Sequence, residues 1–323
     1  MEADIKKIME KQGYRFIGSH AAVKICNWCK QSLRNKGECY KFKFYGVPSW
    51  RCCQISPWIA CENKCLHCWR AIELSMNTLI NKNKLCSPEE IIKGCVEKQR
   101  ELLSGFRGNK KINLKRFVEA REPSQFAISL IGEPTLYPFI GELIELLRRK
   151  RKTSFLVTNG LHPEILKKLE KAKQLPTQLY ISVNAPNKKE YDKWHKSELK
   201  DAWKRFNKSL ELFAKLKNKT RTILRFTLVK DMNMKPEFIK DYARLINKAK
   251  PLFVELVAFK SVGFARKRLD YETMPSMKDI LSFGKMLAKF CKIKILGKHI
   301  PSRVCLLGKP KDKKRMKIKQ EEI

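Results

Sequence analysis

The stretch SPWIACENKCLHC (residues 56–68) places a short apolar segment directly before a loop with three cysteines. Cys61, Cys65 and Cys68 are separated by three and then two residues. A structural zinc site usually has four ligands in two pairs, and no paired fourth ligand is evident here. Three thiolates can instead hold three irons of a cubane iron–sulfur cluster and leave the fourth iron open. The spacing therefore favours an iron–sulfur loop over a zinc site.

Short apolar strands alternate with amphipathic helices along the rest of the chain. We expect strands within residues 56–60, 125–132, 154–160, 178–184, 222–229 and 251–259. Helices are expected between and after them, within residues 88–105, up to residue 149, and within 163–173, 202–216, 236–249 and 276–290. This alternation implies an α/β fold with a parallel sheet, and about six such units would close part of a TIM-like barrel. A doubly wound open sheet is the alternative, although no GxGxxG loop supports it.

The cysteines are concentrated at the start of the chain, where ten of the twelve precede residue 96. The first residues are charged and lack the apolar core of a signal peptide, and no apolar run is long enough to span a membrane. We therefore expect a cytoplasmic protein whose thiols stay reduced. Clustered cysteines in that compartment indicate metal binding or catalysis rather than disulfides.

The charge of the chain is strongly unbalanced, with 70 Lys and Arg against 32 Asp and Glu and a formal net charge of +38. Such an excess favours a polyanionic partner, while a lysine-rich proteome is the alternative explanation. No pattern typical of duplex-DNA binding domains is present, so RNA is the expected partner. The basic stretches at residues 108–116, 148–152 and 265–268 are candidates for phosphate contacts.

The cysteine loop after a first strand resembles the radical S-adenosylmethionine (SAM) superfamily, whose fold is a partial (β/α)6 barrel. The resemblance implies that Cys61, Cys65 and Cys68 bind a [4Fe–4S] cluster whose open iron chelates SAM. It also implies that Gly132 and Glu133, in SLIGEPTLYP, hold the amino group of SAM, with an isoleucine in place of the family's first glycine. Polar residues at the next strand ends would meet the SAM ribose or carboxylate, namely Thr158, Asn159, Ser182 and Asn184. The alternative for Thr158 and Ser182 is that they merely cap loops.

A closer resemblance covers roughly residues 14–305. The stretches VKICNWCKQSLRNKGECYKFKFYGVPSWRCCQISP, LRFTLVKDMN and VELVAFKSVGFARKRL resemble the archaeal TYW1-type tRNA 4-demethylwyosine synthases. The resemblance implies a second [4Fe–4S] cluster on Cys26, Cys39 and Cys52, which are twelve residues apart. Cys29 and Cys53 compete for these positions, and a Cys26–Cys29 pair would suit zinc in isolation.

The family reaction condenses N1-methylguanosine, next to the anticodon of tRNA(Phe), with two carbons of pyruvate to form 4-demethylwyosine. A lysine amine could form a Schiff base with the keto group of pyruvate. Lys41 is the candidate, with Lys43 and Lys260 as alternatives. We also expect an external electron donor and a monomeric protein.

These expectations divide the chain into an N-terminal iron–sulfur extension (1–54), a radical SAM partial barrel (55–300) and a flexible basic C-terminal tail (301–323). Two other functions stay open. A radical SAM RNA methyltransferase could carry a methyl group on Cys305. A non-catalytic RNA-binding protein could use the same cysteines to hold zinc.

Overall fold

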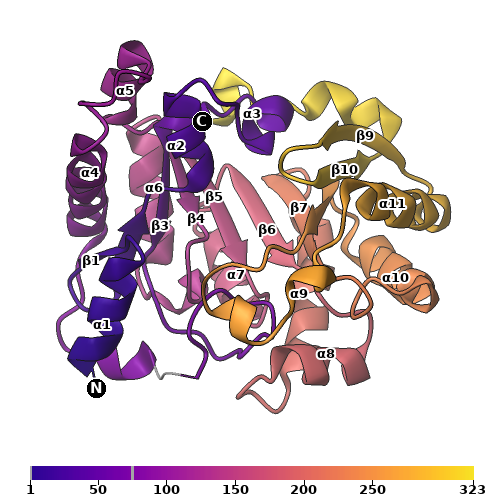
Figure 1. Ribbon diagram of the computed structural model, residues 1–323. Coiled ribbons are helices and arrows are strands. Elements are labelled where there is room, and N and C mark those ends of the chain that lie inside the picture. Colours follow the sequence, from indigo (N-terminus) through magenta and orange to yellow (C-terminus); the bar gives the residue numbers. More distant parts are fainter. Residues whose placement is uncertain (1, 74–75) are drawn as a thin grey trace.

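Six parallel strands form the centre of the sheet, in the order in which they occur along the chain. The computed structural model describes residues 2–73 and 76–323 (Figure 1). The parallel strands are β3 (Cys52–Ser56), β4 (Gln125–Ile128), β5 (Thr153–Thr158), β6 (Gln178–Ser182), β7 (Arg221–Leu228) and β8 (Phe253–Ala258). This arrangement confirms the predicted α/β partial barrel.

Antiparallel strands extend the sheet at both edges. On one side β2 (Ala21–Lys24) pairs with β3, and β1 (Arg15–Ile17) pairs with β2. On the other side β10 (Val304–Gly308) pairs with β8, and β9 (Lys294–His299) pairs with β10. The sheet therefore has ten strands, runs from β1 to β9 and is not closed into a full barrel.

Helices connect the parallel strands and cover one face of the sheet, as Figure 1 shows. The helices of the fold are α1 (Glu2–Lys11), α2 (Asn27–Leu33), α3 (Tyr40–Tyr45), α4 (Pro88–Ser104), α5 (Leu114–Ala120), α6 (Ile140–Arg149), α7 (Pro163–Lys171), α8 (Lys188–His195), α9 (Ala202–Leu216), α10 (Ile239–Ala249) and α11 (Met277–Cys291). Within the described ranges, none of them has the length and apolar character needed to cross a bilayer.

Two of the predicted boundaries are wrong. The first parallel strand was expected at residues 56–60, but β3 spans Cys52–Ser56, because its ladder with β4 begins at the Cys52–Gln125 pair and a proline follows Ser56. The predicted flexible tail over residues 301–323 contains β10, which lies inside the sheet between β8 and β9. The residues after β10 also pack against the fold, since Ile318 donates its N–H to the carbonyl of Tyr45.

The two faces of the sheet bury different sets of side chains, since neighbouring residues of a strand point to opposite sides. The outer face joins the main core under the helices, through residues such as Leu156, Leu179, Leu224 and Val254. The inner face packs against α3 through Phe155, Tyr180, Ile223 and Phe253, which lie in the first halves of their strands. Helix α3 therefore covers the inner face near the N-terminal ends of the strands.

Gly132 fixes the turn that follows β4. Its φ of +72° lies in the left-handed region that favours glycine. A Cβ atom on this residue would lie 2.0 Å from the carbonyl oxygen of Trp58 and 2.8 Å from that of Ala60. The next residue, Glu133, donates its N–H to the Ala60 carbonyl over 2.8 Å. The turn after β4 is therefore in backbone contact with the segment that leads into the cysteine loop.

We predict that Gly132→Ala lowers the free energy of unfolding by about 2 kcal/mol or more, because the methyl group meets backbone that cannot move aside. The measurement is urea unfolding followed by circular dichroism. Gly108→Ala is the matched control, since its added Cβ would have no atom within 4 Å. Equal stability of the two variants would show that the turn after β4 adapts to a side chain.

Candidate functional site

The cysteine loop lies between β3 and α4, and its three thiols are partly buried. The N–H of Cys68 donates to the carbonyl of Cys65 over 3.0 Å, which turns the loop back on itself. The N–H of Asn63 donates to the sulfur of Cys61 over 3.4 Å. In Figure 1 this loop follows the lower end of β3, whereas α2 and α3 lie at the upper edge of the sheet.

A buried arginine accompanies these thiols. Burial raises the pKa of the Cys61 thiol to about 12, against the opposing effect of the Arg70 guanidinium. Burial, together with the neighbouring Cys61 and Cys68, also raises the pKa of Cys65. The pKa of Arg70 is raised by the three thiols in spite of its own burial. Metal ligation must displace the thiol protons, and a buried cation then stabilises the resulting thiolates.

The same loop contains buried polar atoms without protein partners in the described part of the chain, namely Nε of Arg70 and the side-chain amide of Asn63. Unpaired buried polar atoms are rare in folded proteins. Three converging thiols, a buried cation and unpaired polar groups fit the iron–sulfur cluster that the spacing predicts. These cysteines are the residues that could hold it.

Glu133 is a fully enclosed carboxylate at the end of β4, with an exposed fraction of 1%. It accepts hydrogen bonds from the N–H and hydroxyl of Thr135 (3.1 and 2.6 Å), the hydroxyl of Thr158 (2.7 Å) and the N–H of Asn159 (2.7 Å). Burial and the charge of Glu62 raise its pKa, while these donors oppose the rise. Thr158 therefore orients Glu133, and the carboxylate joins the ends of β4 and β5.

Asn159 connects β5 to the cysteine loop, since its side-chain N–H lies 3.7 Å from the sulfur of Cys61. The loop is held from a second direction by an ion pair between Glu62 and His162. Hydrogen bonding and charge from Glu62 raise the pKa of His162 to about 9, against the effect of burial. Glu133, Thr158, Asn159 and Cys61 are therefore brought together.

The two candidate residues at the end of β6, Ser182 and Asn184, form no hydrogen bond with Glu133 within the described residues. Ser182 is partly exposed on the inner face of the sheet. Asn184 is buried, and its amide oxygen accepts the N–H of Thr227 over 3.0 Å. Its side-chain nitrogen lies 3.5 Å from Nε2 of His67. The amide of Asn184 therefore bridges the cysteine loop and β7, which is a structural role in this conformation.

His67, inside the cysteine motif, was missed by sequence reasoning. Its Nδ1 accepts a hydrogen bond from Nε1 of Trp194 over 2.8 Å, and the two rings stack with centroids 5.4 Å apart. Burial lowers the pKa of His67 to about 3, so the ring is neutral at physiological pH. An aromatic heterocycle between two candidate ligand cysteines was the available signal, but its partner lies 127 residues away in sequence.

The second set of cysteines is also gathered by the fold. Cys26 and Cys39 precede the first turns of α2 and α3, and Cys52 begins β3. Burial raises the pKa of Cys39 to about 11 and that of Cys52 to about 12, and in both cases the charge of Lys41 opposes the rise. The thiols of Cys26 and Cys39 are close enough to Cys52 to raise its pKa further.

The two alternative ligands, Cys29 and Cys53, are packed into the core of the fold. Cys53 follows Cys52 in β3 and therefore points to the opposite side of the sheet, where it is fully buried in the main core. Cys29 is fully buried between α2 and its neighbours, and its thiol donates to the carbonyl of Trp50 over 3.6 Å. Their packing leaves Cys26, Cys39 and Cys52 as the candidate ligands of the second set.

Helix α3 is held against the sheet by a buried carboxylate that sequence reasoning also missed. Glu255 of β8 is fully buried and accepts the hydroxyls of Tyr40 (3.1 Å), Tyr45 (2.5 Å) and Tyr180 (3.2 Å). Arg225, its register partner on β7, adds a positive charge at 3.7 Å. A charged residue inside the apolar strand PLFVELVAF was the signal for this network.

Lys41 follows Tyr40 in α3 and lies on the inner face of the sheet. Its ammonium group is 5.4 Å from the ring centroid of Phe155. Its charge opposes the rise that burial causes in the pKa of both Cys39 and Cys52. Lys43, the alternative on the same helix, is exposed, and its charge contributes to lowering the pKa of His299. Lys260 lies 6.0 Å from the ring centroid of Trp28 and interacts with the charge of Cys39.

No three His, Cys, Asp or Glu side chains among residues 2–73 and 76–323 are arranged around the position of a single metal ion. In a cubane cluster each thiolate binds a different iron, so the ligand sulfurs are spread further apart than around one ion. Cys305, the proposed methyl carrier, is fully buried in the main core, which makes it unsuitable for transferring a group to RNA.

One predicted phosphate contact has another role. Arg268 donates to the carbonyls of Leu66 (3.1 Å) and Arg70 (3.2 Å) and forms an ion pair with Glu73. Its guanidinium therefore holds the segment after β8 against the cysteine loop. The basic stretch at residues 265–268 does not offer this side chain to RNA in this conformation.

Comparison with known proteins agrees with this geometry. The chain matches the model of the radical SAM superfamily over residues 55–243 and that of wyosine base formation over residues 248–309. The S-adenosyl-L-methionine-dependent tRNA 4-demethylwyosine synthase of Pyrococcus abyssi (strain GE5 / Orsay) is 43% identical over 314 residues, covering 95% of this chain and 89% of that protein. The corresponding protein of Methanocaldococcus jannaschii is 35% identical over 94% of this chain and 95% of its own length.

A solved structure of TYW1 with a lysine–pyruvate adduct bound is similar over 98% of both chains, with a TM-score of 0.83 and 33% identity. The likeness extends through the N-terminal segment and the residues after β10. This chain therefore belongs to the radical SAM superfamily and, within it, to the family of the S-adenosyl-L-methionine-dependent tRNA 4-demethylwyosine synthases.

Proposed function

We propose that this chain converts N1-methylguanosine beside the anticodon of tRNA(Phe) into 4-demethylwyosine, with pyruvate as the donor of two carbons. The observation that carries the proposal is the position of Lys41. This lysine lies on the inner face of the sheet, beside Cys39 and Cys52, in a family with a solved lysine–pyruvate adduct.

Cys61, Cys65 and Cys68 would hold the [4Fe–4S] cluster that is implied by the radical SAM family. When bound, this cluster supplies the electron that cleaves SAM to a 5′-deoxyadenosyl radical. The chain's own part is to hold and orient the cofactor. Glu133 is preorganised by Thr135, Thr158 and the backbone of Asn159, which suits it to accept a hydrogen bond from the SAM amino group.

Cys26, Cys39 and Cys52 would hold a second [4Fe–4S] cluster. Lys41 would attack the keto carbon of pyruvate, so that a carbon–nitrogen double bond forms and the keto oxygen leaves as water. The fold fixes this lysine through its neighbour, since the Tyr40 hydroxyl donates to buried Glu255 and accepts from Arg225 over 2.8 Å. A catalytic group on a rigid helix can meet its substrate without a further ordering cost.

The positive charge of the chain supports tRNA as the partner. The modified base would have to leave its stack in the anticodon loop to reach the inner face of the sheet. We further propose that an external donor supplies the electrons, that the protein acts as a monomer, and that it works in the cytoplasm, where its tRNA substrate is found. The ligands of one cluster would then come from the chain up to Cys52, the first residue of β3, and those of the other from the loop after β3.

The first functional prediction concerns the number of clusters. Anaerobically reconstituted protein should bind about eight irons as two [4Fe–4S] clusters. Replacing Cys61, Cys65 and Cys68 by alanine should leave about four irons and abolish SAM cleavage. Replacing Cys26, Cys39 and Cys52 should also leave about four irons, yet retain SAM cleavage. Iron analysis and chromatography of 5′-deoxyadenosine provide the measurements.

Cys53→Ala combined with Cys29→Ala is the matched control for the second triple variant, because both thiols are buried and face away from the proposed site. This control should keep the full iron content. Loss of iron from the control, with none lost from the triple variant, would transfer the ligand assignment to Cys29 and Cys53.

The second functional prediction concerns Lys41. With methylated tRNA, SAM, a reductant and labelled pyruvate, the parent protein should form the tricyclic product, and borohydride should attach the label to the protein. Lys41→Arg keeps the positive charge but cannot form an imine, so it should lose trapping and product while retaining both clusters and 5′-deoxyadenosine formation. Lys43→Arg is the control on the same helix and should behave as the parent. Normal product from Lys41→Arg would refute the assignment.

The third functional prediction concerns RNA binding. If the protein neutralises about six phosphates, raising the salt concentration from 50 to 200 mM should lower its affinity for tRNA on the order of a thousandfold. Fluorescence anisotropy with labelled tRNA measures this slope. A flat response would show that the net charge of +38 reflects composition rather than RNA contacts.

A further inference from the structure

The C-terminal segment, defined here as residues 310–323, contacts the C-terminal end of α3. The ammonium group of Lys317 donates to the last carbonyls of the helix, those of Phe42 (3.0 Å) and Lys43 (2.8 Å). The N–H of Ile318 donates to the carbonyl of Tyr45 over 3.1 Å. The carbonyls of Lys43 and Tyr45 are among those that a short helix otherwise leaves to solvent, while the Phe42 carbonyl also accepts the N–H of Gly46 over 3.0 Å.

Apolar contacts accompany these hydrogen bonds. Met316 and Ile318 are partly buried against the cluster that contains Tyr40, Phe44 and Tyr45 of α3. Helix α3 therefore packs against both the sheet and the C-terminal segment. A six-residue helix has little stability of its own, so these surroundings determine its position.

A buried cation fastens the segment to the sheet. Arg221, the first residue of β7, is 2% exposed. Its guanidinium donates to the carbonyl of Met316 (2.9 Å), to the side chain of Gln178 (2.9 Å) and to both carboxylate oxygens of Glu322 (3.1 and 3.3 Å). A buried charge is costly without a partner, and Glu322 is the carboxylate that pairs with Arg221 among the described residues.

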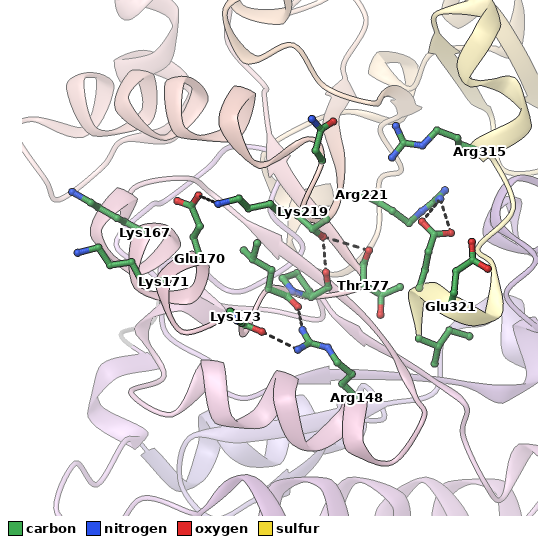
Figure 2. Close-up of a pocket in the computed structure, with 16 residues that line it drawn as sticks. Arg148, Lys167, Glu170, Lys171, Lys173, Thr177, Lys219, Arg221, Arg315 and Glu321 are labelled. Carbon is green, nitrogen blue, oxygen red and sulfur yellow. Dashed lines mark hydrogen bonds and ion pairs between the residues drawn. The ribbon is translucent and has the colours of Figure 1, made fainter.

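Figure 2 shows this anchor at the edge of a cavity of about 820 Å³, where Arg221, Arg315 and Glu321 approach one another from β7 and the C-terminal segment. The same cavity is lined by Lys167, Lys171 and Lys173 of the α7 region, which make it strongly basic. Glu322 carries its negative charge into this basic cavity. Charge complementarity therefore favours the docked position of the segment.

We infer that the C-terminal segment is a positioning element for pyruvate chemistry: Lys317 and Glu322 hold α3 so that Lys41 and Cys39 keep their places on the inner face. This inference rests on the proposed function of Lys41. Neither residue lies among the side chains of the cysteine loop, so loosening the segment affects the pyruvate step and leaves SAM cleavage intact.

Two pairs of variants test the inference in the full-length, reconstituted protein. Lys317→Ala removes the donor to α3. Lys319→Ala is its control, because the side chain of Lys319 forms an ion pair with exposed Glu321 at 3.2 Å and makes no hydrogen bond to α3 within residues 2–73 and 76–323. Glu322→Gln removes the charge that neutralises Arg221, and Glu321→Gln is its control. All four sites are near the surface or replaced by a side chain of similar shape, so each variant should fold.

Hydrogen exchange of the α3 amides is the direct readout. We expect exchange about tenfold faster in Lys317→Ala and Glu322→Gln than in the parent, since a hydrogen bond to a charged group is lost in each. Borohydride trapping of labelled pyruvate below saturation should slow by about tenfold in the same variants, with a higher KM for pyruvate and an unchanged rate of SAM cleavage. Both controls should match the parent, and Lys317→Arg should restore trapping.

The outcomes separate this inference from the proposed function. If the parent traps no pyruvate, the lysine imine is refuted, and hydrogen exchange alone still decides whether the segment holds α3. If the parent traps pyruvate and the two variants match their controls in both exchange and trapping, the inference is overturned. Equal loss of SAM cleavage and trapping would also overturn it, because the effect would then be general.

Discussion

The placement of one buried carboxylate, Glu255, governs the interior of this protein. A carboxylate inside a sheet needs hydrogen-bond donors and a balancing charge. Here three tyrosine hydroxyls donate to Glu255, and the Arg225 guanidinium adds a positive charge at 3.7 Å. Two of those tyrosines belong to α3, so satisfying Glu255 requires that helix to lie on the inner face. The positions of Cys39 and Lys41 follow from this requirement, because both are adjacent to Tyr40 in the chain.

The two thiol sets occupy different ends of the same interior. Cys52 is the first residue of β3, and Cys61 lies five residues beyond its end. Parallel strands place their carboxyl ends at one edge, which explains why Glu133, Thr158 and Asn159 gather around the cysteine loop. The opposite end would be open in a simple barrel, but α3 covers it. The proposed SAM site and the proposed pyruvate site would thus lie at opposite ends of the parallel strands.

The sequence alone predicts most of the helices and strands and the cysteine loop. Ser87 and Glu90, in the sequence SPEE, form a capping box at the start of α4, with hydrogen bonds of 3.2 and 2.7 Å. The strands β4 to β8 lie where apolar runs predict them, and the cysteine spacing identifies the radical SAM loop. The first strand was misplaced because the run SPWIA is more apolar than CCQIS, although only the latter pairs with β4.

The sequence by itself determined the periodic elements, the ligand spacing and the family, since all three depend on residues that are close in the chain. The tertiary structure decided which face each thiol occupies, how Asn184 and His67 pair across the site, and that residues 310–323 hold α3 rather than form a free tail. These features join residues more than a hundred positions apart. Their energies come from desolvation and charge neutralisation in the folded interior, which no local pattern encodes.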